Sequence, residues 1–389
     1  MTRRHPLWRL VALIFALAIV AAACGGSSKT KASTNGTQAS GGGVTCSGIS
    51  LGFFGALTGD AANLGINIKH GAQLAVNQFN KANPGCQVGF EDFDSQGSPD
   101  QAPALAQQAV GDKKLVGLIG PAFSGESRAA DPIFNEAVLP IITPSATGVD
   151  LSAQGWKIFH RGLANDGAQG PAEAKYLATS LGAKNVAVID DASEYGKGLA
   201  DIVRKTLPDN GSKVAVSDSV DPKAQDFSST VNKVKAANPD AIFYGGYYAG
   251  AGRLAKQLRD GGVKATFVSG DGTLDKGFVS AAGAAAGEGA IITCPCAPSP
   301  DAYKAAYTAA WKEDPGTYSP EAYDAANMFL AALKAGKKDR ASINTWLGSN
   351  SYEGITKTLK FDDKGEVTSG AIYVYKVVGG AITSLGPVK

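Results

Sequence analysis

Residues 116–147, VGLIGPAFSGESRAADPIFNEAVLPIITPSAT, decide the fold class of this chain. The apolar run Leu115–Ile119 is long enough for one buried strand of a parallel sheet, and Gly120-Pro121 ends it. Apolar residues at helical spacing then predict a helix from Ser124 to about Ala137, and a second apolar run, Val138–Ile142, predicts the next strand. The stretch is therefore a βαβ unit, which indicates an α/β fold with parallel sheets.

Both strands of this unit are followed by small hydroxylated residues, Ser124 after the first and Ser145 and Thr147 after the second. In an open α/β sheet, ligands bind in the crevice outside the carboxyl ends of the strands. Helix N-termini at that edge offer free backbone N–H groups to an anion. These three residues are therefore candidates for binding a small carboxylate. The alternative is that they act only as helix N-caps, which contribute about 1 kcal/mol each.

The first residues of the chain have the composition of an export signal. Three Arg precede an apolar run, Leu10–Ala23, which at about 14 residues is too short to span a membrane and fits a secretory signal. Small residues before Cys24 resemble the bacterial lipobox, in which that Cys is lipidated and becomes the mature N-terminus. Ala21 departs from that pattern, which prefers Leu there. Cleavage by the ordinary signal peptidase and a single-pass anchor are the alternatives to a lipoprotein signal peptide over residues 1–23.

Residues 24–45 consist of Gly, Ser, Thr and other polar residues with almost nothing apolar, which is typical of a flexible tether. About 20 such residues span about 25 Å root-mean-square. Signal, lipidated Cys and tether predict an extracytoplasmic protein anchored to the outer face of the cell membrane. Without residues 1–23, which hold three Arg and no acidic residue, the formal net charge changes from +2 to −1. Because the remaining Lys and Arg are dispersed, no nucleic-acid partner is expected.

The remaining part of the chain, about 345 residues, exceeds one typical core and predicts two lobes. Cys46 precedes the predicted strand Ile49–Phe54, and Cys86 precedes the predicted strand Val88–Phe93. If these strands are adjacent and parallel, both thiols lie at one end of the sheet in an oxidising compartment, and we predict a Cys46–Cys86 disulfide. For Cys294-Pro295-Cys296, a disulfide and free thiols both remain open. The three His have no ligand spacing with it, so no metal is expected.

Apolar runs and helical periodicity alternate along the rest of the chain, which predicts a second parallel sheet flanked by helices. Further strands are expected over Gly155–Arg161, Asn185–Ile189, Lys213–Ser219, Ala241–Tyr244, Thr266–Gly270 and Ala371–Val377. Further helices are expected over Ala62–Asn80, Pro103–Val110, Gln169–Leu181, Tyr195–Thr206, Phe227–Ala236, Ala249–Asp260, Tyr303–Trp311 and Glu321–Ala335.

Two motifs resemble those of the periplasmic leucine/isoleucine/valine-binding proteins, the type I solute-binding family. One is GP-x-x-S-G…A-x-P…P-x-I-x-P-S-A-T in the stretch quoted above, and the other is GALTGDAANLG…GAQLAVNQFN at residues 55–80. The resemblance covers about residues 47–380. It implies two Rossmann-like lobes with parallel sheets joined by three hinge crossings. Lobe 1 would comprise residues 46–165 and 293–358, and lobe 2 residues 166–292 and 359–389.

The resemblance also implies a ligand site between the lobes. Tyr195 lies in a D-x-x-x-Y-G loop whose Tyr faces the cleft, and Tyr247 is favoured over Tyr248 as a second aromatic. Asp271 stands where amino-acid-binding members have an acid, commonly Glu, for the ligand ammonium, and Leu64 stands where some members have Tyr. Each could instead be structural, as a packing or turn residue. The expected ligand-binding set is Leu64, Phe123, Ser124, Ser145, Ala146, Thr147, Tyr195, Tyr247, Asp271 and Tyr318.

The function implied by the resemblance is that of a monomeric, cofactor-free, substrate-binding lipoprotein of an ABC importer. It would bind a small amino acid, foremost a branched-chain one, and deliver it to an ABC permease. The alternatives keep the fold with a short amide, urea or an aromatic acid as ligand, or make the protein a sensor subunit. An enzyme is not expected, because the sequence has no G-x-S-x-G, P-loop or H-E-x-x-H motif and no His near a candidate nucleophile.

Overall fold

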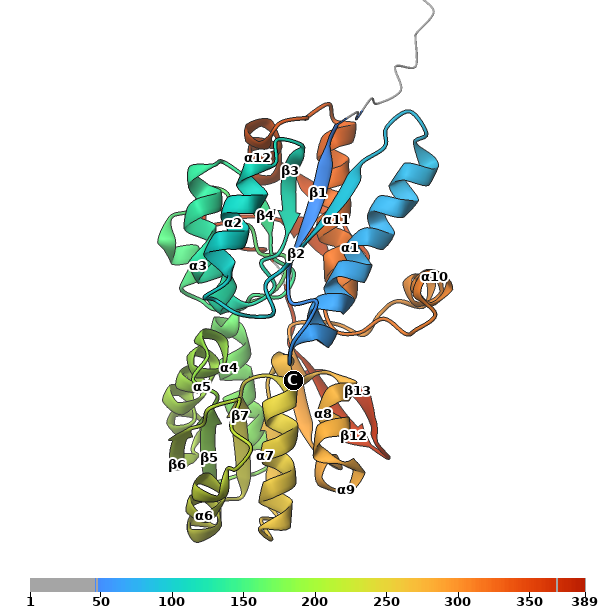
Figure 1. The fold of residues 1–389 in the computed structure, drawn as a ribbon. Helices are drawn as coiled ribbons and strands as arrows, with labels where there is room; N and C mark the ends of the chain where they lie inside the picture. The colour runs from blue at the N-terminus through green and yellow to red at the C-terminus, as the bar shows by residue number, and fades with distance from the viewer. Residues whose placement is uncertain (1–45, 47, 369, 389) are drawn as a thin grey trace, which may run out of the picture. The chain divides into compact units, whose positions relative to one another are not determined.

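The computed structural model describes residues 46, 48–368 and 370–388. The predicted signal peptide, the lipidated Cys24 and the tether lie outside these described residues. The described chain forms two α/β lobes, each built on one sheet with helices on both faces (Figure 1). No helix in this part of the chain has both the length and the apolar character needed to cross a membrane.

The sheet of the first lobe is parallel throughout, with the strand order β2-β1-β3-β4. Its strands are β1 (Ser50–Gly55), β2 (Gly89–Asp94), β3 (Leu115–Ile119) and β4 (Ile141–Ile142). The helices that cover it are α1 (Ala62–Ala82), α2 (Ala102–Gly111), α3 (Ser124–Glu136) and α11 (Ser319–Lys334). Leu51 and Phe53 pack with residues of α1 and α11, whereas Phe54 points to the other face and packs with residues of α2 and α3. This alternation is what a strand buried on both faces requires.

The predicted strand Val138–Ile142 is shorter than expected. Only Ile141 and Ile142 form β4. Val138 has a φ of 52° and is 42% exposed, so it belongs to the turn after α3. An apolar run alone does not show at which residue the buried strand begins.

The sheet of the second lobe has the order β13-β12-β9-β8-β7-β5-β6. Its strands are β5 (Asn185–Asp190), β6 (Lys213–Ser219), β7 (Ala241–Gly245), β8 (Thr266–Ser269), β9 (Ile291–Cys294), β12 (Tyr373–Val378) and β13 (Ala381–Pro387). The strands from β5 to β9 are parallel, but β12 is antiparallel to both β9 and β13. The expected purely parallel sheet is therefore wrong at this edge. Gly379 and Gly380 both have positive φ and form the two-residue turn of a β-hairpin, which makes β12 and β13 antiparallel.

The helices of the second lobe divide between the two faces of its sheet. They are α4 (Asp166–Lys175), which continues into a π-helical turn over Tyr176–Ser180, α5 (Glu194–Thr206), α6 (Ser228–Ala237), α7 (Tyr248–Asp260), α8 (Lys276–Ala282) and α9 (Ala284–Gly287). Val188 packs with residues of α4 and α5, and Ile189 with residues of α6 and α7. The remaining elements are α10 (Asp301–Trp311), α12 (Arg340–Ser349) and the hairpin of β10 (Ser351–Glu353) and β11 (Thr358–Lys360).

The chain passes between the lobes after β4, after β9 and after β11. The predicted strand Gly155–Arg161 is wrong, because Arg161 forms only isolated bridges, to Thr143 and Glu366. The fully buried Arg161 guanidinium donates to the Glu366 carboxylate at 2.6 and 3.1 Å. It also donates to the carbonyls of Ala146 and Gly148 at 2.9 and 2.8 Å. Arg161 therefore joins the first and third crossings to the loop that follows β4.

Two disulfides are present in the described chain. Cys46 and Cys86 are bonded at the amino ends of β1 and β2, which are adjacent and parallel, so the predicted pairing is confirmed. Cys294 and Cys296 are also bonded to each other, and this settles the question that the sequence left open. The second disulfide lies where the chain leaves β9 to return to the first lobe.

Candidate functional site

A small cavity lies between the lobes, at the carboxyl ends of their strands. Its volume is about 10 Å³, which is the space of a single water molecule. The residues that line it come from both lobes and are Leu64, Ile68, Ala122, Phe123, Ser124, Ser145, Tyr195, Tyr247, Asp271, Gly272 and Tyr318. Side chains of the two lobes are in contact around it, so the cleft is closed.

All of the residues expected in the site except Ala146 and Thr147 line this cavity. Both exceptions are buried in the loop behind Ser145. Ile68, which also lines the cavity, was not expected, although its place one helical turn after Leu64 puts it on the same face of α1.

The hydroxyl groups of the first lobe differ in what they offer a ligand. Ser124 Oγ accepts a hydrogen bond from the Gly148 N–H at 3.1 Å, so its own proton is available for donation. Ser145 Oγ already donates to the Ala122 carbonyl at 2.7 Å. Ser124 also begins α3, where backbone N–H groups are free. A carboxylate requires donors, so Ser124 suits it better than Ser145.

Asp271 provides a negative charge at this cavity. Its Oδ1 accepts a hydrogen bond from the Tyr195 hydroxyl at 2.9 Å, and its Oδ2 accepts one from the Tyr318 hydroxyl at 2.5 Å. Burial raises the pKa of Asp271, and the two phenol hydrogen bonds oppose that shift. Because Tyr318 precedes α11 of the first lobe and Asp271 follows β8 of the second, the Tyr318–Asp271 bond connects the lobes.

Two further buried acids on α4 lie behind Asp271. Burial, with the Asp271 charge adding to it, raises the pKa of Asp166 to about 7, and the same causes raise the pKa of Glu173. Glu173 accepts a hydrogen bond from the Thr293 hydroxyl, and the Thr147 side chain interacts with the Asp166 carboxyl group and opposes the rise of its pKa. Sequence reasoning did not single out these acids, because no local motif distinguishes them from other acids on a helix. Of these three carboxyl groups, Asp271 is the one that lines the cavity, so it is the acid that faces a cation at this end.

Aromatic rings form a further part of the cavity wall. Tyr247 packs edge-to-face on Phe123 with ring centroids 5.2 Å apart, and its ring also lies 5.2 Å from that of Tyr195. Tyr248, the alternative that the sequence offered, does not line the cavity. Its hydroxyl instead accepts a hydrogen bond from the Asn63 N–H at 3.4 Å. The cavity thus has an acidic end, a hydroxyl-bearing loop and an apolar aromatic wall.

Glu126 supports the loop that carries Ser124. One of its carboxylate oxygens accepts a hydrogen bond from the Ser95 hydroxyl, and the other accepts one from the Phe123 N–H at 3.3 Å. The side chain is fully buried, and burial raises the pKa of Glu126 to about 8.

Replacing Glu126 with Gln is expected to reduce the pH dependence of stability. An unfolded Glu titrates near pH 4.3, so the native state with its raised pKa binds the proton more tightly. The stabilisation is then complete below about pH 4.3 and is lost as the pH rises towards 8, by up to about 1.4 kcal/mol per pH unit. Between about pH 5 and 8, the stability measured by thermal unfolding should fall less steeply with rising pH in Glu126→Gln than in the parent.

The control for this experiment is Glu136→Gln, which changes an exposed carboxyl group at the end of the same helix. That variant should keep the parental slope. Other buried carboxyl groups contribute to the slope in all three proteins, so the comparison between them isolates Glu126. Equal slopes in Glu126→Gln and the parent would contradict the prediction.

Within residues 46, 48–368 and 370–388, no three His, Cys, Asp or Glu side chains are arranged to hold a metal ion.

The chain is similar to known proteins over most of its length. Residues 48–381 match the family described as periplasmic binding protein. A leucine-, isoleucine-, valine-, threonine- and alanine-binding protein of Pseudomonas aeruginosa is 32% identical, over 84% of this chain and 89% of that protein. A Leu/Ile/Val-binding protein of Escherichia coli is 30% identical, over 82% of this chain and 88% of that protein.

Solved structures agree with these relatives. A branched-chain amino acid transporter substrate binding protein of Streptococcus pneumoniae, in complex with isoleucine, is 29% identical with a TM-score of 0.80, covering 87% of this chain and 99% of that one. A leucine binding protein of Thermotoga maritima is 26% identical with a TM-score of 0.80, covering 88% of this chain and 99% of that one.

Proposed function

The chain belongs to the periplasmic binding protein family, and from this premise we propose that it binds a branched-chain amino acid between its lobes and delivers it to an ABC permease. The observation that carries the proposal is that a carboxylate and a hydroxyl donor, from different lobes, line the same cavity. The buried Asp271 carboxylate lies at one end, and the free Ser124 hydroxyl lies in the loop of the other lobe. An amino acid needs both an acid for its ammonium and donors for its carboxylate.

In this proposal, each part of the ligand has a counterpart in the site. The ammonium group binds Asp271, and the carboxylate binds Ser124 and the N-terminus of α3. Thr147 is a further hydroxyl in the loop of Ser145 and Ala146, and it lies against the buried Asp166 carboxyl group, whose pKa it lowers. The apolar side chain lies against a wall made of Leu64, Ile68, Phe123, Tyr195, Tyr247 and Tyr318. Hydrogen bonds to charged groups contribute about 1.5–3 kcal/mol each, so several of them support micromolar binding.

Ligand entry requires the lobes to separate, because a cavity of about 10 Å³ does not hold an amino acid. We propose a hinge motion about the three crossings, in which each sheet and its covering helices move as one lobe and the crossings follow β4, β9 (Ile291–Cys294) and β11 (Thr358–Lys360). The Tyr318–Asp271 hydrogen bond, which connects the lobes, breaks during opening.

The proposal extends to the amino-terminal segment. Residues 1–23 are removed as a signal peptide, Cys24 is lipidated, and residues 24–45 tether the monomeric binding domain to the outer face of the membrane. The sequence pattern of residues 1–45 supports this part of the proposal.

A thermal-shift screen of the chain from Val44 onward tests the ligand. The panel contains the twenty amino acids, urea, short amides and aromatic acids. A ligand at 100 times its dissociation constant stabilises the folded protein by about 2.7 kcal/mol, and we expect this from leucine, isoleucine or valine. A response to an amide or an aromatic acid, with none to any amino acid, would replace the proposed ligand.

A further inference from the structure

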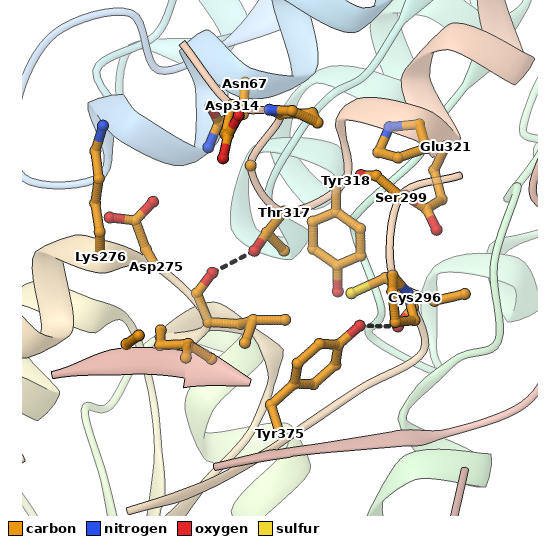
Figure 2. A pocket seen from close by; sticks show the side chains of 18 of the residues that line it. Asn67, Asp275, Lys276, Cys296, Ser299, Asp314, Thr317, Tyr318, Glu321 and Tyr375 are labelled. Carbon is orange, nitrogen blue, oxygen red and sulfur yellow. Dashed lines mark hydrogen bonds between the residues drawn. The ribbon is translucent and has the colours of Figure 1, made fainter. Parts of the chain in front are cut away.

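Three of the hydrogen bonds that join the two lobes lie beside the small cavity but outside its lining. The Asn63 side-chain amide donates to Asp275 Oδ1 at 2.9 Å, and the Asn63 N–H donates to the Tyr248 hydroxyl at 3.4 Å. The Thr317 hydroxyl donates to the Leu274 carbonyl in the wall of a neighbouring pocket of about 400 Å³ (Figure 2). Asn63 and Thr317 belong to the first lobe, and their three partners belong to the second.

These contacts are close in the chain to the residues that line the cavity. Asn63 is followed by Leu64 at the start of α1, and Thr317 is followed by Tyr318 just before α11. On the side of the second lobe, the partners of both side chains follow Asp271 in the same short loop after β8. A movement that forms these hydrogen bonds therefore also brings the two walls of the cavity together.

Asp275 is the charged member of this set. It is 6% exposed, and its Oδ1 also accepts a hydrogen bond from the Gly277 N–H at 2.7 Å, as the N-cap of α8. Burial raises the pKa of Asp275, and the contacts with Asn63 and Gly277 and the charge of Lys276 oppose that shift. Hydrogen bonds to an ionised acceptor are roughly twice as strong as neutral ones. The contact from Asn63 to Asp275 is therefore the one whose loss should matter most.

A further contact between the lobes provides a control. Arg253 of the second lobe lies 3.9 Å from the Asp60 carboxylate of the first lobe, and the Asp60 side chain is 74% exposed. Ion pairs as exposed as this one contribute little, because water and salt screen them. Removing the Asp60 charge should therefore leave the closure of the lobes unchanged, although Asp60 lies in the same loop as Asn63.

We propose that Asn63 and Thr317, with Asp275 and Leu274, form an interlobe latch that sets the affinity and the residence time of the ligand without touching it. The measured affinity combines the contacts inside the cavity with the free energy of closing the lobes. A latch that stabilises the closed arrangement therefore lowers the dissociation constant of any ligand that the cavity takes. The inference rests on the proposed function for the existence of a ligand, but not for its identity.

An exchange of the two side chains at positions 63 and 275 tests the latch. Asn63→Asp places two carboxylates against each other when the lobes close, whereas water solvates both when the lobes are apart. We expect the affinity for leucine to fall at least roughly tenfold, mainly through faster dissociation. Adding Asp275→Asn should restore most of that loss, because the new amide can donate to the new carboxylate and Asn is as good an N-cap as Asp. Calorimetry and stopped-flow fluorescence measure the two quantities.

Thr317→Val provides an independent variant, because it removes only the hydroxyl donor to Leu274. It should weaken leucine binding roughly threefold to tenfold, and Asp60→Asn should leave the affinity unchanged. Unchanged affinity in both Asn63→Asp and Thr317→Val would overturn the proposal. So would a double variant, Asn63→Asp with Asp275→Asn, that binds no better than Asn63→Asp alone.

Failure of the proposed function is seen separately, in the parent. If the parent binds no branched-chain amino acid, the same variants are compared with the amide or aromatic acid that the thermal-shift screen identifies. The ratio of variant to parent affinity then tests the latch with that ligand, because the contacts from Asn63 and Thr317 lie outside the cavity.

Discussion

Replacing Asp271 with Asn is expected to weaken the binding of leucine, isoleucine or valine by about 100-fold, equivalent to about 2.7 kcal/mol. The substitution preserves the shape of the side chain and its ability to accept from one of its two phenol partners, Tyr195 and Tyr318. It removes the charge that faces the ligand ammonium in a buried site. Isothermal titration of the parent and the variant with leucine measures the loss.

The matched ligand for this experiment is 4-methylpentanoate, which is leucine without its amino group. Because it has no ammonium group, its affinity should change far less in Asp271→Asn, and the same discrimination should hold in Asp271→Ala. Equal losses for leucine and 4-methylpentanoate would remove Asp271 from the ammonium role. Thermal unfolding of both variants without ligand shows whether the fold is intact.

Replacing Cys46 and Cys86 together with Ser is expected to lower the free energy of unfolding by about 4 kcal/mol in the chain-entropy model. The disulfide closes a loop with a sequence separation of 40 residues and so restricts the unfolded chain. Urea denaturation measures the change. Affinity for the amino acid should stay constant, because this disulfide lies at the amino ends of β1 and β2 and the cavity lies at the carboxyl ends of the strands.

The second disulfide provides the comparison. Cys294 and Cys296 have a sequence separation of 2, so replacing both with Ser should lower the free energy of unfolding by only about 1 kcal/mol in the same model. Losses of equal size for the two double variants would contradict the loop-length argument.

Much of the fold follows from local sequence pattern, because most strands appear as apolar runs and most helices as a helical period. The strand β9 (Ile291–Cys294) and the helix α8 (Lys276–Ala282) were not expected. The errors arise where local apolar pattern does not determine the secondary structure. Val138 continues an apolar run but lies in a turn, and the residues up to Arg161 form no strand, although the N–H groups of Ile141 and Thr143 donate to the Ile158 and His160 carbonyls. The helix α12 was not expected, since only Ile343 and Leu347 of its residues are buried and the apolar signal is weak.

The sequence predicted which loops form the site, but it did not predict the hydrogen bonds within the site. The positions of Ser124 and Ser145 after two neighbouring strands predicted the same role for both, yet only the structure shows that Ser145 donates its proton to a carbonyl. Asp166 and Glu173 belong to the surroundings of Asp271 through packing of α4 against the second sheet, which no local motif encodes. Contacts between residues far apart in the chain decide which polar groups are already satisfied.

The threading of the chain through both lobes affects when the protein becomes folded. The first sheet depends on α11 (Ser319–Lys334) for one of its covering faces, and in the second sheet β12 (Tyr373–Val378) lies between β9 and β13. Neither lobe can therefore be completed before the last part of the polypeptide is available. Non-local pairing of this kind slows folding. Both lobes are therefore expected to assemble together, once the last part of the chain is available.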